Sequence, residues 1–377
     1  MVVEELVTAI HAQPQRMVLN FAGAGSQALA WLHGLSGSSR TILEATDRYT
    51  ATSLVEAVGF TPDRFTSLQV AKALAENGER RARHLASDEG PLFGLGCTAT
   101  IATDRTKQGD HRCAVAVRSA LGTAGYELTL TKGARDRTAE EELVSLVILK
   151  ATADAKGVLN GPELPLLDGE RFTQTFAPRS PFDRFAAGEL PWVLIRPEDG
   201  VPTTGGPPKG VAILSGSFNP LHRGHLGLAW AAAEHLGCRV LFELPLVNAA
   251  KAAISPFEAW RRAGQFATVA PLLLTRSPLF AAKAGLFPGS VFVIGSDTAV
   301  RVVDPRFYEG GLAGVQEALG VVRSCGARFL VALRQHRGRL LSLGDAPVPG
   351  GFEDLFEELP AEAFRLDLSS SEIREGW

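Results

Sequence analysis

The second half of the chain alternates short apolar runs with segments of helical spacing. The apolar runs, each of which predicts a strand, are residues 211–214, 240–242, 291–294 and 328–333. Residues 226–236 and 256–269 have the composition and spacing of helices. Apolar strands separated by helices are typical of a parallel sheet with helices on both faces. We therefore predict a Rossmann-like α/β domain over residues 210–377, with ligands at the carboxyl ends of its strands.

The first half mixes helical and strand patterns with glycine-rich turns, which predicts a second α/β domain over residues 1–155. Residues 156–209 are rich in proline and glycine, and end in the run Val-Pro-Thr-Thr-Gly-Gly-Pro-Pro-Lys-Gly that covers 201–210. This density of proline and glycine disfavours the interiors of helices and sheets. We therefore predict an α/β protein of two domains, joined by a connecting segment and linker over 156–209.

Composition narrows the classes of partner. Hydrophobic residues make up 45% of the 377 residues and charged residues 21%, as in soluble globular proteins. The formal net charge of -3 gives no global basic field for nucleic acid or an anionic membrane. Residues 1–15 lack the apolar core of a signal peptide, and the four cysteines form no CxxC pair. We expect a cytoplasmic protein without nucleic-acid or membrane partners and without a metal held by side chains alone.

The turn after the first C-terminal strand carries the strongest candidate chemistry, Ser-Gly-Ser-Phe-Asn-Pro-Leu-His-Arg-Gly-His over residues 215–225. Gly216 allows a sharp turn, and a helix is predicted to begin within 221–224, where its N–H groups form an anion site. His222 and His225 are three residues apart, so on a helix they share one face and can donate to phosphate oxygens. The candidate binding residues of the turn are Gly216, Ser217, Phe218 and Asn219.

Two other interpretations of this turn are open. The histidines can be incidental surface residues of a tight turn. They can also be metal ligands, although His-x-x-His offers two ligands and no evident third.

A second donor-rich segment, Asp-Leu-Ser-Ser-Ser-Glu-Ile-Arg, covers residues 367–374. Ser369 and Ser370 are good helix N-caps, and Arg374 can hold phosphate with a planar set of donors. By itself, this segment also fits an ordinary capped helix with a surface arginine.

Together the two segments resemble the signatures of the nucleotidylyltransferase superfamily. Residues 216–225 resemble its His-x-Gly-His motif, and residues 367–374 resemble Ile-Ser-Ser-Thr-x-Ile-Arg, with Leu368 and Ser371 as replacements. The resemblance implies transfer of a nucleotidyl group from ATP to a phosphate-bearing acceptor. It implies that His222, His225 and Arg374 are the catalytic residues.

Three further segments, 245–251, 275–289 and 292–298, resemble the nicotinamide-nucleotide adenylyltransferases. The resemblance implies that Asn248 and Lys251 line the nucleotide site, and that Gly295 and Asp297 lie beside the ATP ribose. Family members often carry Asn-Ala-Asp-Lys where this chain has Ala250, so a carboxylate is lost there.

The reaction implied is attack of the nicotinamide mononucleotide 5′-phosphate on the α-phosphorus of ATP, giving NAD and pyrophosphate. A phosphate monoester has a second pKa of about 6, so the attacking group needs no general base near neutral pH. Mg²⁺ is expected to arrive with ATP rather than in a protein cage. Nicotinate mononucleotide and phosphopantetheine stay open as acceptors, as does a non-catalytic nucleotide-binding protein.

The N-terminal half is similar to the CinA C-terminal domain, whose active members are nicotinamide mononucleotide deamidases. The similarity rests on the order of segments such as 20–26, 34–41, 46–49, 66–75 and 93–102. Active members carry Glu-Ser-Cys-Thr-Gly-Gly where this chain has residues 21–26, so Ala22 stands at the nucleophile position. Ser26 is a candidate substitute or a helix cap. We predict a domain without deamidase activity, kept for binding, assembly or packing, in a homo-oligomer; amide hydrolysis stays open.

Overall fold

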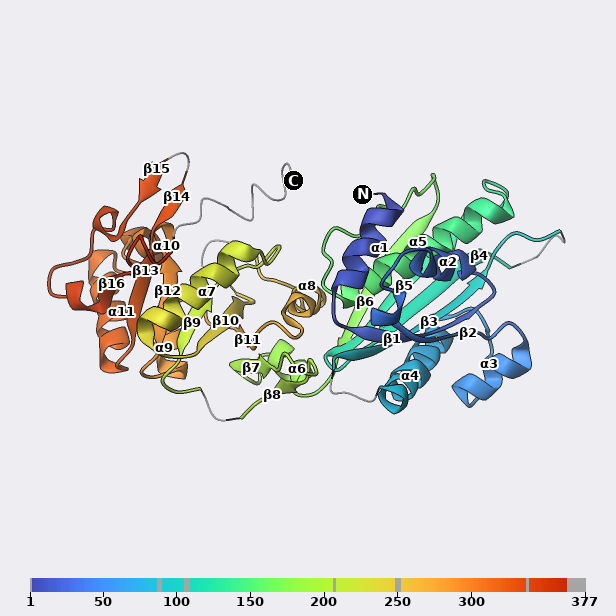
Figure 1. The fold of residues 1–377 in the computed structure, drawn as a ribbon, viewed down its shortest axis with the longest axis horizontal. Helices are drawn as coiled ribbons and strands as arrows, with labels where there is room; N and C mark the ends of the chain where they lie inside the picture. The colour runs from blue at the N-terminus through green and yellow to red at the C-terminus, as the bar shows by residue number, and fades with distance from the viewer. Residues whose placement is uncertain are drawn as a thin grey trace. The chain divides into compact units, whose positions relative to one another are not determined.

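The structure is a computed structural model that describes residues 2–86, 90–104, 109–205, 208–247, 252–336 and 339–364. The chain divides into two compact units, each built on its own sheet (Figure 1). The first unit comprises Met1–Ala186, Arg196–Pro202 and Pro256–Val269; the second comprises Ala187–Ile195, Thr203–Ser255 and Ala270–Trp377. No helix within the described ranges is long and apolar enough to cross a membrane.

The first unit has a six-stranded sheet in the order β2-β1-β3-β4-β5-β6. Its strands are β1 (Arg16–Ala22), β2 (Ile42–Asp47), β3 (Leu92–Thr100), β4 (His111–Arg118), β5 (Gly122–Leu130) and β6 (Arg171–Pro178). Strand β1 is parallel to β2 and β3, and the remaining pairs are antiparallel. Its helices are α1 (Val3–Ala12), α2 (Ser26–Gly34), α3 (Ala51–Val58), α4 (Leu68–Leu85), α5 (Arg137–Ala155), α6 (Phe182–Ala186) and α8 (Pro256–Ala263).

Close packing of α4 on β3 depends on two glycines. A Cβ atom at Gly94 would lie 1.9 Å from the carbonyl oxygen of Ala75, and one at Gly96 would lie 2.2 Å from that of Ala71. No side chain fits at either position, so glycine is required for the helix to approach the strand this closely.

The predicted connecting segment 156–209 contains regular structure. Strand β6 pairs antiparallel with β5, and β7 (Trp192–Ile195) and β8 (Pro202–Thr203) extend the sheet of the second unit. The ring of Phe176 in β6 stacks on Trp260 of α8 at 5.4 Å between centroids. These partners lie far away in the sequence, so the proline and glycine content of the segment does not reveal them.

The second unit has an eight-stranded sheet in the order β16-β13-β12-β9-β10-β11-β7-β8. Its other strands are β9 (Ala212–Ser215), β10 (Val240–Pro245), β11 (Leu272–Thr275), β12 (Val291–Gly295), β13 (Arg328–Ala332) and β16 (Phe356–Glu358). The pairs from β16 to β11 are parallel, and β7 is antiparallel to β11. Strands β14 (Arg334–His336) and β15 (Arg339–Leu341) form a separate hairpin. The predicted α/β fold with a mostly parallel sheet is confirmed.

Helices cover this sheet and complete its core. They are α7 (Arg223–Leu236), α9 (Phe280–Leu286), α10 (Ser296–Val302) and α11 (Leu312–Ser324). A buried apolar cluster joins Phe292 and Phe329 of the sheet to Val315 and Leu319 of α11. Helix α7 packs against β9 and β10.

Short 3-10 helices in the two units cover Ser38–Arg40, Gly264–Phe266, Pro305–Phe307, Leu343–Asp345 and Glu353–Leu355.

The core of the first unit buries a lysine that has no carboxylate partner among the residues that the structure describes. Lys156, directly after α5, is 0% exposed, and its Nζ donates to Thr41 Oγ1 at 2.9 Å. Thr41 Oγ1 lies 2.8 Å from His11 Nδ1, and His11 Nε2 lies 2.9 Å from the Leu32 carbonyl oxygen. Burial lowers the pKa of Lys156 to about 7, and the charge of Arg40 acts in the same direction. Burial also lowers the pKa of His11.

This lysine makes the stability of the first unit depend on pH. An unfolded lysine has a pKa of about 10.4, so between pH 7 and 10 the unfolded state binds a proton that the folded state lacks. The free energy of unfolding therefore rises with pH in that window and is independent of this group below it. Denaturant unfolding of wild type and Lys156→Met at pH 7 and pH 10 should show the wild type gaining about 3–5 kcal/mol relative to the variant. An identical pH slope for the two proteins would contradict the lowered pKa.

Candidate active site

The turn that follows β9 is built around a buried phenylalanine. Phe218 is fully buried, has a positive φ of 45°, and packs edge-on against Phe242 at 5.6 Å and against His225 at 5.0 Å between ring centroids. A Cβ atom at Gly216 would lie 2.5 Å from the Phe218 ring, so residue 216 must lack a side chain for this ring to lie under the turn. The Asn219–Pro220 peptide bond is cis. Helix α7 begins directly after this turn, at Arg223.

Two histidines cap the N-terminus of α7. His222 is the N-cap, and its Nδ1 accepts from the backbone N–H of Gly224 at 3.2 Å. The Nδ1 of His225 accepts from the backbone N–H of His222 at 3.3 Å. An imidazole whose Nδ1 accepts a hydrogen bond carries its proton on Nε2 when neutral. The capping bonds therefore make Nε2 the donor atom of both rings.

The two rings lie against each other, with centroids 3.8 Å apart and planes at 32°. The sequence predicted two histidines on one face of a helix, whereas the structure places His222 in extended conformation just before the helix and His225 in its first turn. The reason is that the two Nδ1 atoms accept from the backbone N–H groups of Gly224 and of His222 itself, which find no acceptor inside the helix. The predicted proximity is present, and two adjacent Nε2 donors can bind oxygens of one phosphate group.

A second turn of this edge begins at Gly295, where β12 ends, and carries the predicted ribose-site residues Gly295 and Asp297. Strand β12 lies beside β9, with Val293 opposite Leu214, so the two turns follow at the same edge of the sheet. Asp297 lies in the first turn of α10, where its Oδ2 is 3.2 Å from Nη2 of Arg301. The structure therefore brings Gly295 and Asp297 to the edge that carries Gly216, Ser217, Phe218, Asn219 and both histidines.

The other predicted site residues cannot be placed. Asn248, Lys251, Ser369, Ser370 and Arg374 lie outside the described residues, as does Ala250.

A buried ion pair that the sequence patterns do not predict holds the end of β9. Glu243 of β10 is 0% exposed and Lys283 of α9 is 3% exposed, with Oε2 and Nζ 2.7 Å apart. Thr275 at the end of β11 donates to the other carboxylate oxygen of Glu243, and Lys283 Nζ also donates to Ser215 Oγ at 3.4 Å. Ser215 directly precedes Gly216, so the network fixes the residue at which the turn begins.

A sequence signal for this pair exists. Glu243 is the one charged residue in the strand Val-Leu-Phe-Glu-Leu-Pro of β10. A charge inside an apolar strand requires a buried partner, but the sequence does not identify Lys283 as that partner.

In the first unit, a carboxylate of the protein itself lies at the start of α2, after the glycine-rich turn. Oε1 of Glu141 accepts from Gly25 N at 2.9 Å, Ser26 Oγ at 3.0 Å and Gln27 N at 3.2 Å. Ser26, the predicted cap, is the first residue of α2. The N-cap position is held by Gly25, one residue earlier. Burial and the charge of Glu141 raise the pKa of nearby Asp47. The carboxylate of Glu141 therefore accepts the hydrogen bonds that this helix N-terminus could otherwise donate to an external anion.

Comparison with protein families gives one match in the second half of the chain. The family model described as cytidylyltransferase-like matches residues 213–376. The C-terminal half contains a cytidylyltransferase-like domain. The match supports a nucleotidyltransferase, and it includes both turns at the edge of the parallel sheet.

Comparison with solved structures finds weak likenesses over about two fifths of the chain. They include competence/damage inducible protein CihA from Agrobacterium tumefaciens, at 18% identity over 40% of this chain and 91% of that one, with a TM-score of 0.31. A competence or damage-inducible protein from Enterobacter asburiae has 12% identity over 40% and 99%, with a TM-score of 0.32. A CinA superfamily protein from Enterobacter cloacae has 12% identity over 41% and 90%, with a TM-score of 0.30.

Scores of this size carry no argument about activity. A comparison with curated proteins finds no match.

The buried ion pair makes a testable prediction about stability. Lys283→Met leaves the Glu243 charge buried without its cation, so the free energy of unfolding should fall by about 3–5 kcal/mol. The double variant Glu243→Gln/Lys283→Met removes both charges and should recover much of that loss. Denaturant unfolding of wild type, single and double variants measures both effects. Equal destabilisation of the single and double variants would show that the unpaired charge is not the cause.

Proposed function

We propose that the cytidylyltransferase-like domain transfers the adenylyl group of ATP to the 5′-phosphate of nicotinamide mononucleotide, giving NAD and pyrophosphate. The observation that carries this proposal is the pair of Nε2 donors at the start of α7, on the carboxyl edge of a parallel sheet. The acceptor rests on the resemblance of 245–251, 275–289 and 292–298 to nicotinamide-nucleotide adenylyltransferases.

In the proposed reaction an acceptor phosphate oxygen attacks the α-phosphorus of ATP. The new P–O bond forms as the bond from the α-phosphorus to the bridging oxygen breaks, and pyrophosphate leaves with that electron pair. No covalent enzyme intermediate forms, and the dianionic acceptor needs no general base. His222 and His225 donate from Nε2 to oxygens of the α-phosphoryl group, where charge accumulates in the transition state.

The remaining substrate contacts are proposals from resemblance. Lys251, Arg374 and the serines Ser369 and Ser370 would hold the β- and γ-phosphates. Asn248 would line the nucleotide site, and Gly295 with Asp297 would lie beside the ribose.

We propose that a magnesium ion binds together with ATP and not in a cage of protein side chains. Within the ranges that the structure describes, no cluster of three His, Cys, Asp or Glu side chains could hold a metal by itself. Mg²⁺ commonly keeps few protein ligands and binds through substrate phosphates. When bound in this way it neutralises charge on the phosphates that leave.

For the first unit we propose a role in binding, assembly or packing without amide hydrolysis. Ala22 has no nucleophilic atom at the end of β1, and Ser26 donates its hydroxyl hydrogen to Glu141. Because the same oxygen of Glu141 also accepts from two backbone N–H groups, we propose that Ser26 is part of the helix start and not a nucleophile.

The histidines can be tested by separating capping from donation. His225→Ala removes both, and His225→Asn keeps an oxygen that can accept the His222 N–H but loses the Nε2 donor. Both variants should lower turnover by roughly 10²–10³-fold, as expected for loss of one transition-state donor. Pyrophosphate release from Mg-ATP and nicotinamide mononucleotide measures turnover, and circular dichroism checks folding. His235→Ala, in the last turn of the same helix, is the matched control. A folded His225→Asn variant with wild-type turnover would refute the donor role.

The acceptor and the first unit can be tested in one assay. Nicotinamide mononucleotide, nicotinate mononucleotide and phosphopantetheine are offered in turn, and pyrophosphate and ammonia are followed in parallel. We expect pyrophosphate with nicotinamide mononucleotide and no ammonia. Pyrophosphate with another acceptor would keep the transferase and correct its substrate. Ammonia without pyrophosphate would assign the activity to the first unit.

A further inference from the structure

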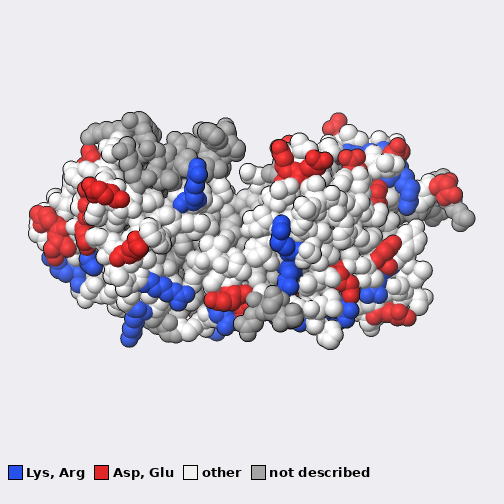
Figure 2. Space-filling view, in the orientation of Figure 1, with Lys and Arg blue, Asp and Glu red and all other residues white. Residues whose placement is uncertain are grey.

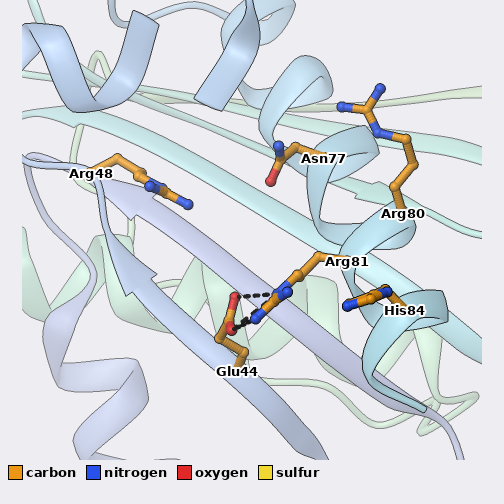
Figure 3. Close-up of a pocket in the computed structure, with 6 residues that line it drawn as sticks. All are labelled: Glu44, Arg48, Asn77, Arg80, Arg81 and His84. Carbon is orange, nitrogen blue, oxygen red and sulfur yellow. Dashed lines mark hydrogen bonds and ion pairs between the residues drawn. The ribbon is translucent and has the colours of Figure 1, made fainter. Parts of the chain in front are cut away.

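The first unit has a second concave site, between β2 and α4. A depression of about 450 Å³ is lined by Glu44, Arg48, Asn77, Arg80, Arg81 and His84 (Figure 3). Its volume lies in the range of small-molecule sites. None of its residues belongs to the proposed transferase site.

One ion pair is already satisfied within the depression. The guanidinium of Arg81 donates to both carboxylate oxygens of Glu44, with Nη2 2.8 Å from Oε2 and Nε 3.2 Å from Oε1. The hydrogen bond from Arg81 lowers the pKa of Glu44, so this carboxylate stays ionised and its charge is matched. The two arginines left among the lining residues, Arg48 and Arg80, therefore give the depression a net positive charge.

Arg48 presents a donor that needs an acceptor. Its Nε is buried and has no hydrogen-bond partner among the described residues. Figure 3 shows its guanidinium extending toward α4, the helix that carries Arg80 and His84. A buried donor left unsatisfied costs about 1–3 kcal/mol, so a ligand that draws the Arg48 side chain toward the depression would relieve that cost.

The chemistry fits a small oxyanion. Guanidinium groups present planar sets of N–H donors that match phosphate oxygens. The net charge of the whole chain is -3, and the face in Figure 2 shows acidic and basic side chains interspersed. Nucleic acid requires an extended basic surface, whereas Arg48 and Arg80 line one depression. We propose that the depression between β2 and α4 binds a phosphate-bearing small molecule.

The test is calorimetric titration of the full-length protein at low salt with three probes: inorganic phosphate, pyrophosphate and ATP without metal. The variants are Arg48→Gln/Arg80→Gln and, as a control, Arg83→Gln. Arg83 lies on the same helix, pairs with Glu79 at 2.8 Å and does not line the depression. The His222→Ala/His225→Ala variant is titrated both with and without the two arginine substitutions, which separates this site from the transferase site.

We expect at least tenfold weaker binding of one class of site in Arg48→Gln/Arg80→Gln, and little change in Arg83→Gln. This class should persist in the histidine background, so its loss is distinguishable from failure of the proposed function. The probe with the highest affinity at that class distinguishes free phosphates from a nucleotide. Binding that falls equally in Arg83→Gln, or that is unchanged in the double variant, would overturn the proposal.

Discussion

The first backbone N–H groups of α7 must find acceptors, and the candidate active site follows from how they do so. The chain meets this requirement with the Nδ1 atoms of His222 and His225. Each bond fixes the proton of the neutral ring on Nε2, so capping the helix also creates two adjacent donors. The buried ring of Phe218 and the absent side chain of Gly216 bring the chain to the helix in this conformation. Structural and chemical roles therefore rest on the same two hydrogen bonds.

The two units satisfy a helix start in opposite ways. At α2 the donors around Ser26 are taken by a carboxylate, that of Glu141, which leaves an anion in place. At α7 the acceptors are neutral imidazoles, which can in turn donate to an external anion. The start of α7 therefore fits the proposed binding of a substrate phosphate. Beneath the turn before α7, the buried pair of Glu243 and Lys283 anchors Ser215.

The sequence predicted what depends on local pattern. Apolar runs such as 291–294 gave the parallel strands because a strand buried on both faces has no polar positions. The turn of 215–225 was predicted because its residues are contiguous. Contacts between distant residues were not predictable in this way. Glu243 and Lys283 are 40 positions apart, and Glu141 and Gly25 are 116 apart.

The same limit explains why residues 156–209 were predicted to be only a connecting segment and linker. Strand β6 is held by its pairing with β5 and by the stacking of Phe176 on Trp260 of α8. Helix α8 in turn joins the first unit, where Arg261 Nε lies 2.6 Å from the buried carboxylate of Asp154. Proline and glycine content describes the backbone preferences of residues 156–209 but says nothing about such partners.

In the proposed reaction, the bond that breaks joins the α-phosphorus of ATP to the oxygen that bridges it to the β-phosphorus. The most direct measurement uses ATP labelled with ³²P at the α-position, with nicotinamide mononucleotide and Mg²⁺, followed by separation of the products. We expect the label to move into the dinucleotide and the pyrophosphate to be unlabelled. Label found in ADP, or in AMP without dinucleotide, would mean that phosphate transfer or hydrolysis occurs instead of adenylyl transfer.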